Sequence, residues 1–253
     1  MFAAIWATRW YLLLGLFTFL VFLAINAPLH FVWRMLEPDV RNLPVDVRSV
    51  SGTLWHGHLQ AEQRQLGPID AEWRLSPWAL LTAAAEVDLT LTAPAIRMNG
   101  LVRLEADQQL HVTGLDGFVD TDLLKPLLKP LQIDLSGNIE ANDVAAVIEL
   151  DTRQLTALGG RLVFSGGAAA FPVQRKRVTA EVPMLVGALG MDKERAVLDV
   201  TSMEGQKLVQ GFIQPDGWGG VAIRRRMFDV LGQTWPDKAD VDTVVFEVSR
   251  KIL

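Results

Sequence analysis

The sequence predicts a mainly β protein, with a single N-terminal transmembrane helix followed by a large, curved, mostly antiparallel sheet domain with a few short helices. Residues 10–33 contain no Asp, Glu, Lys or Arg. From about residue 45 onward, apolar and polar residues repeatedly alternate with period two, which is typical of strands with one buried face. The intervals between these segments are too short for the crossover helices that parallel strands need, so an antiparallel meander is the simplest topology.

The uncharged run at residues 10–33 is the first predicted element. As a helix it is about 36 Å long, enough to cross a hydrocarbon core of about 30 Å. Trp6, Trp10 and Tyr11 stand near its start and Trp33 at its end. Amphipathic aromatic rings favour the headgroup level, so these side chains are expected to anchor the helix at both membrane surfaces.

A cleaved secretory signal is the alternative for this run, because Arg9 precedes the apolar stretch and residues 24–27 have the small-residue character of a cleavage site. The run is long for a signal sequence, however, and Pro28 would directly follow the cut. A retained signal anchor fits better.

The charges around the run predict its orientation and the division of the chain. The N-terminal tail carries Arg9 and no acidic residue, whereas basic and acidic residues nearly cancel just beyond residue 33. The positive-inside rule then places the N-terminus in the cytoplasm and the C-terminal domain on the other side of the membrane. We expect a cytoplasmic tail at 1–9, a transmembrane helix at 10–33, a connector at 34–44 and a β domain beyond the membrane at 45–253.

The β domain is expected to contain about a dozen strands. No linker rich in Pro, Gly or Ser interrupts it, so it reads as one domain. The alternating segments are Ile69 to Leu75, Val87 to Leu91, Ile96 to Met98, Val102 to Leu104, Leu110 to Val112, Leu131 to Glu140, Ile148 to Leu150, Val178 to Val182, Ala196 to Val200, Leu208 to Phe212 and Val244 to Val248.

Three short segments of this domain are predicted to be helical. At Ser76 to Leu81, a capping serine precedes a proline at the first helical position. Asp122 to Leu128 has a helical apolar stripe that prolines limit to about one turn. Arg225 to Leu231 is the third. By contrast, Gly217 to Gly220 is interpreted as a turn between strands.

Tryptophans are expected to dominate the core of the N-terminal half. Trp55 shares its parity with Val45, Val47 and Leu59, and Trp73 shares a face with its apolar neighbours. A buried tryptophan removes roughly 150–250 Å² from water. We therefore expect Trp55, Trp73 and Trp78 to pack near each other, with an exposed aromatic docking patch as the alternative.

Composition excludes several functional classes. There are 24 Lys+Arg against 29 Asp+Glu, and all the acidic residues lie beyond residue 34. The β domain is therefore acidic and lacks the clustered positive charge that nucleic-acid binding needs. Arg224 to Arg226, with Lys125 and Lys129, is interpreted as solvated surface, with a contact to acidic lipid or a partner protein as the alternative. The chain has no Cys, which excludes disulfides and thiol catalysis.

Residues with catalytic or metal-binding chemistry are few. His56 and His58 are spaced to share one strand face, and a metal site would need His111 and a carboxylate to converge on them. There is no Gly-x-Ser-x-Gly elbow and no phosphate-binding Gly-x-x-x-x-Gly-Lys motif. The sequence therefore predicts no catalytic, cofactor-binding or metal residues, no cofactor and no enzymatic activity.

Two segments carry a resemblance to a known family. The stretches Val50-Ser-Gly-Thr-Leu-Trp-His-Gly57 and Ala71-Glu-Trp-Arg-Leu-Ser-Pro-Trp-Ala-Leu-Leu81, behind one membrane helix that ends in Ala27-Pro28, resemble protein N of the bacterial type II secretion system. The resemblance implies a single-pass inner-membrane protein of a Gram-negative cell with a periplasmic β domain. Its role would be that of an accessory scaffold for export of folded proteins across the outer membrane, without catalytic residues. Other inner-membrane and periplasmic secretion subunits and the lipid bilayer would be its partners.

Two further hypotheses stay open at this point. Curved antiparallel sheets on one membrane anchor are similar to AsmA-like proteins, whose apolar β groove shelters acyl chains; an apolar face left uncovered by helices would favour lipid binding or transfer. A periplasmic hydrolase would need His56, His58 and His111 to converge with a carboxylate.

Overall fold

The structure, a computed structural model, describes residues 15, 16, 18, 19, 22, 45–64, 66–129, 132–173, 176–233 and 240–251. The few described residues inside the predicted membrane span are helical, and the rest of 10–33 lies outside the described part. Among the described residues, no helix is both long and apolar enough to cross a bilayer. The membrane span therefore stays a prediction.

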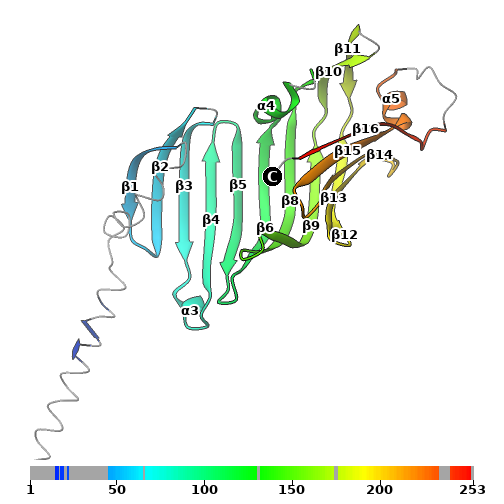
Figure 1. Cartoon of the computed structure of the whole chain (residues 1–253). Coiled ribbons are helices and arrows are strands. Elements are labelled where there is room, and N and C mark those ends of the chain that lie inside the picture. Colours follow the sequence, from blue (N-terminus) through cyan, green and yellow to red (C-terminus); the bar gives the residue numbers. More distant parts are fainter. Residues whose placement is uncertain are drawn as a thin grey trace, which may run out of the picture.

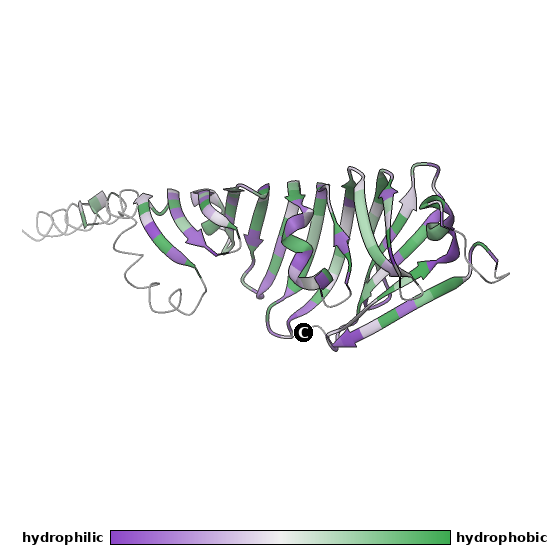
Figure 2. Cartoon of the chain, turned by 90° about the horizontal axis from the view of Figure 1, so that it is seen from above, coloured by the Kyte–Doolittle hydropathy of each residue, from purple (hydrophilic) through white to green (hydrophobic). Residues whose placement is uncertain are grey.

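One large antiparallel sheet forms most of the described chain (Figure 1). It has thirteen strands, in the order β1-β2-β3-β4-β5-β6-β8-β9-β12-β13-β14-β15-β16. Their bounds are β1 (Asp46–Gly52), β2 (His56–Gln63), β3 (Gly67–Leu75), β4 (Ala85–Ala93), β5 (Ile96–Leu104), β6 (Gln109–Asp120), β8 (Asn138–Glu149), β9 (Gln154–Phe164), β12 (Leu185–Asp192), β13 (Arg195–Ser202), β14 (Lys207–Ile213), β15 (Trp218–Arg224) and β16 (Val244–Lys251). The predicted mainly β class and antiparallel meander are confirmed. Seen from above, the sheet bends along its length, and β16 turns across its C-terminal end (Figure 2).

A second, three-stranded sheet interrupts the meander at two places in the chain, between β6 and β8 and between β9 and β12. It has the order β11-β10-β7, with β7 (Asp134–Leu135), β10 (Gly167–Val173) and β11 (Lys176–Val182). The single strand predicted over residues 131–140 is therefore wrong. The chain turns at Gly137, which has a φ of 135°, so β7 pairs with β10 while β8 starts in the large sheet. Alternation alone does not reveal which sheet a strand joins.

All three predicted helical segments contain helix. They form α3 (Pro77–Leu80), the 3₁₀ turn η1 (Thr121–Leu124) followed by α4 (Lys125–Leu128), and α5 (Arg225–Val230). The expected capping role of Ser76 is wrong, however. Its side chain makes no capping hydrogen bond, and its backbone N–H donates to the Glu86 carbonyl oxygen at 2.8 Å, extending the β3–β4 pairing instead.

The chain reverses at Trp55, so the parity argument for its burial is wrong. Residues 53–55 form the turn between β1 and β2, and the Thr53 N–H donates to the His56 carbonyl oxygen at 2.9 Å. Parity does not carry through a turn. Likewise, Gly219 and Gly220 lie inside β15 rather than in the predicted turn, which ends at Gly217.

Candidate functional site: the two faces of the sheet

One face of the large sheet is apolar from edge to edge. A register row of directly paired residues crosses all thirteen strands, about 58 Å along the sheet, without a polar side chain. We call this side the apolar face. Its row consists of Val50, Leu59, Ala71, Leu91, Met98, Gly117, Ala141, Leu162, Gly187, Val200, Val209, Ile223 and Phe246.

The opposite face of the N-terminal strands is polar. On it, His58, Glu72, Thr90, Asn99 and Asp116 form a row from β2 to β6. Along these two rows, alternation separates apolar from polar side chains from β2 to β6, as expected for a sheet with one side in water.

Only part of the apolar face is covered within the described residues. At the C-terminal half, the small sheet and α5 pack on it, and Ala169, Val182, Leu185 and Leu208 form a buried cluster there. Elsewhere large side chains of this face stay accessible: Leu89 is 37% exposed, Val221 43% and Phe246 48%. Exposed apolar surface this extensive usually marks a site that binds a partner or a ligand.

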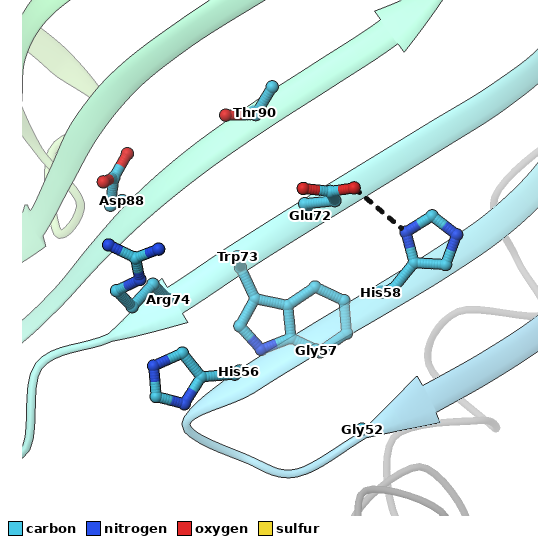
Figure 3. A pocket seen from close by; sticks show the side chains of 9 residues that line it. All are labelled: Gly52, His56, Gly57, His58, Glu72, Trp73, Arg74, Asp88 and Thr90. Carbon is cyan, nitrogen blue, oxygen red and sulfur yellow. Dashed lines mark ion pairs between the residues drawn. The ribbon is translucent and has the colours of Figure 1, made fainter.

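A pocket opens at the N-terminal end of the sheet, where β2, β3 and β4 meet (Figure 3). His58 lies between two carboxylates: its Nε2 is 3.6 Å from Asp70 Oδ1 and its Nδ1 is 3.7 Å from Glu72 Oε1. His56 pairs across the strands with Arg74, which in turn faces Asp88. These groups are half-buried or exposed and mixed in charge, which is typical of a solvated polar face.

The three histidines considered for catalysis or metal binding do not converge. His56 and His58 share β2 as predicted, but His111 lies on β6, four strand spacings or about 19 Å away. In the part of the chain that the structure describes, no three His, Asp or Glu side chains are grouped to hold a metal ion. The geometry gives no support to a hydrolase built on these histidines.

Trp73 lies flat over Gly57 on the apolar face. The two residues pair across β2 and β3, and a Cβ atom at position 57 would lie 2.6 Å from the Trp73 Cη2 atom. The indole Nε1 donates to the Leu54 carbonyl oxygen at 3.3 Å, which ties the β1–β2 turn to β3. The motif residues around positions 52–57 and 73 thus serve one local packing unit.

Replacing Trp73 with alanine is expected to lower the free energy of unfolding by about 2–3 kcal/mol. The variant loses the ring over Gly57 and leaves the Leu54 carbonyl without this donor; the side chain is only partly buried, so the loss is smaller than for a full core site. Denaturant unfolding of the detergent-solubilised protein measures this loss in the free energy of unfolding. Trp73→Phe, which keeps a ring but no donor, should lose about 1 kcal/mol. Equal stability of all three proteins would contradict the packing role.

The expected cluster of three tryptophans is wrong for Trp78. Its side chain is 77% exposed, because α3 projects beyond the ends of β3 and β4 instead of folding over the sheet (Figure 1). The exposed aromatic patch, the alternative considered from the sequence, describes this residue better.

The basic run binds acidic groups of the same chain. Arg226 forms two hydrogen bonds with Asp242 Oδ1, at 2.9 and 3.2 Å, and Arg224 donates to the Asp242 carbonyl oxygen at 2.6 Å. These bonds fix α5 to the segment before β16. Lys125 bonds to Asp122 at 2.8 Å, which raises the pKa of Lys125 above its ordinary value. Arg224, Arg226 and Lys125 therefore bond to groups of the same chain.

Comparison with known proteins identifies the family. The family model for type II secretion system (T2SS) protein N matches residues 44–226, from the start of the large sheet into α5. Searches of curated proteins and of solved structures returned no significant match. Because the family match covers well over half of the 253 residues, the chain belongs to the type II secretion system protein N family.

Proposed function

We propose that this chain is an accessory scaffold of the type II secretion system, anchored in the inner membrane. Residues 1–9 form a cytoplasmic tail, 10–33 the membrane span, 34–44 a connector and 45–253 a periplasmic β domain that supports export of folded proteins. The family match over residues 44–226 carries the proposal, because membership implies contacts with other secretion subunits. The separation of the histidines favours an assembly role over catalysis.

Strand edges are the proposed contact sites. β1 and β16 are the outermost strands of the large sheet, and each pairs with one neighbour in the described chain. Their outer edges present backbone N–H and C=O groups that a strand of a partner can satisfy. On β16, Val244 and Phe246 are 42% and 48% exposed, which adds apolar area beside those backbone groups.

Replacing Phe246 with lysine is expected to reduce recovery of secretion subunits about tenfold in a crosslinked pull-down of the tagged full-length protein, because an edge lysine opposes strand addition. Met203→Lys is the control: Met203 is 66% exposed but lies in the β13–β14 turn, away from both edges. If the unaltered protein recovers no secretion subunit, the scaffold role is wrong. If Phe246→Lys and Met203→Lys behave alike, the β16 edge is not the contact.

The proposed topology has its own test. A reporter enzyme active only in the periplasm, fused after Leu253, is expected to be active. An inactive fusion, together with activity of a cytoplasmic reporter at the same place, would reverse the orientation.

Binding of lipid acyl chains is a second candidate function, and one observation favours it. The apolar row runs across thirteen strands, and parts of that face remain exposed, as Leu89, Val221 and Phe246 show. All thirteen strands pair within the sheet, so a hydrocarbon chain on this face would desolvate few backbone groups.

A further inference from the structure

The tip formed by α3 and the residue after it is the most exposed apolar feature of the described β domain. Trp78 is 77% exposed, Leu80 45% and Leu81 79%. Trp78 and Leu81 are three residues apart on a helical turn, so they project from the same side. α3 lies beyond the ends of β3 and β4, clear of both faces of the sheet (Figure 1).

We propose that this tip, residues 77–81, inserts into the interfacial layer of the membrane that holds the anchor. Tryptophan and leucine are the side chains that partition there, with the indole at the headgroup level. No charged residue occurs between Arg74 and Glu86, so the whole β3–β4 connection can enter the headgroup region without desolvating an ion. The occupant of the patch is thus a lipid surface.

The path of the chain allows this placement. β1 starts at the strand ends opposite α3 and runs toward the side of the sheet that carries α3, over 7 residues or about 23 Å. Residues 34–44, if fully extended, reach at most about 36–40 Å. That length suffices to connect a span ending at residue 33 to β1 while α3 touches the same membrane surface. The inference rests on the membrane anchor proposed above.

Charge limits the contact to this corner of the sheet. The turn between β5 and β6, the next one on the α3 side of the sheet, carries Glu105 and Asp107 and no basic residue. Farther along, Asp151 and Arg153 offset each other between β8 and β9, as do Lys193 and Glu194 between β12 and β13. An anionic lipid surface repels the carboxylates of the β5–β6 turn. We therefore expect the strands to stand on the membrane at the α3 corner, with the β5–β6 turn tilted away.

The absence of cysteine makes a site-specific test direct, because one introduced thiol carries the only label. Leu81→Cys and Leu80→Cys probe the tip. Met203→Cys is the control, because Met203 is 66% exposed and lies in the β13–β14 turn, at the strand ends opposite those that carry α3. Each full-length variant is labelled with an environment-sensitive fluorophore and reconstituted in nanodiscs of phosphatidylethanolamine and phosphatidylglycerol.

The expected result is a blue-shifted emission at positions 80 and 81 that nitroxide-labelled lipid quenches several-fold, with neither effect at position 203. Water-like emission at both tip positions, in protein that elutes with the discs, would overturn the inference. So would shielding at the tip that appears only in native membranes containing other secretion subunits, since the partner is then a protein. Failure of the protein to elute with the discs would instead reject the anchor itself, and with it this placement.

Discussion

A Gly117→Ala substitution is expected to destabilise the protein by about 3 kcal/mol or more. Gly117 has a φ of 156°, and a Cβ atom there would lie 2.8 Å from the Met98 Cα atom and closer still to the Arg97 carbonyl oxygen. Both are backbone atoms of β5, which is paired on both sides, so no rotamer change relieves the clash. Either the β5–β6 register shifts or the backbone strains.

Denaturant unfolding of the full-length protein in detergent measures this loss. Gly190→Ala is a matched control, because Gly190 also lies in a strand of the large sheet but has nothing within 4 Å of its added Cβ atom. Its free energy of unfolding should change by less than about 1 kcal/mol. If both variants are as stable as the unaltered chain, the close approach of β5 to β6 at Gly117 is wrong.

The period-two pattern predicted the fold well where one face is apolar and the other polar. Segments such as Ile69 to Leu75 and Val87 to Leu91 alternate strictly and lie in β3 and β4 as expected. A meander of antiparallel strands preserves this signal, because each strand directs its apolar side chains to one face and its polar side chains to the other.

Three strands rich in glycine or alanine were not predicted. β10, β12 and β15 contain the runs Gly-Ala-Ala-Ala, Val-Gly-Ala-Leu-Gly and Trp-Gly-Gly-Val. At Gly187 a Cβ atom would lie 2.7 Å from Leu198 Cδ1 and 3.6 Å from Leu162 Cβ, so neighbouring leucines already fill the space. The row continues physically although the sequence shows no large apolar residue there.

The continuous apolar row could not be predicted from the sequence either. Alternation assigns residues to a face within one strand, but the alignment between strands depends on turns and bulges. Register shifts occur, for example, between Asn99 and Leu101 on β5 and between Asn142 and Ala145 on β8. Each shift changes which residues lie side by side, so only the paired structure reveals a row that spans the sheet.

A Leu89→Asp substitution is expected to remove most acyl-chain binding if the apolar face shelters lipid. Leu89 lies on β4 beside Trp73, with 37% of its surface exposed, so it belongs to the accessible part of that face. Against a hydrocarbon chain, the new carboxylate must be desolvated or protonated, and either costs well over the 1.4 kcal/mol that corresponds to a tenfold loss of affinity. In water the same change costs little, since the site is partly exposed already.

Thr90→Asp is the control for adding a carboxylate to β4 without changing the apolar face. Thr90 is the next residue on β4 and faces the polar side with Glu72 and Asn99. A phospholipid with a photoactivatable acyl chain is crosslinked to the full-length protein in nanodiscs, and mass spectrometry quantifies the labelled peptides of β3 to β5. We expect strong labelling in the unaltered protein and in Thr90→Asp, and about tenfold less in Leu89→Asp. Equal labelling in both variants, or none in the unaltered protein, excludes lipid from this face. The exposed apolar surface must then be covered by another subunit, and the scaffold role alone accounts for it.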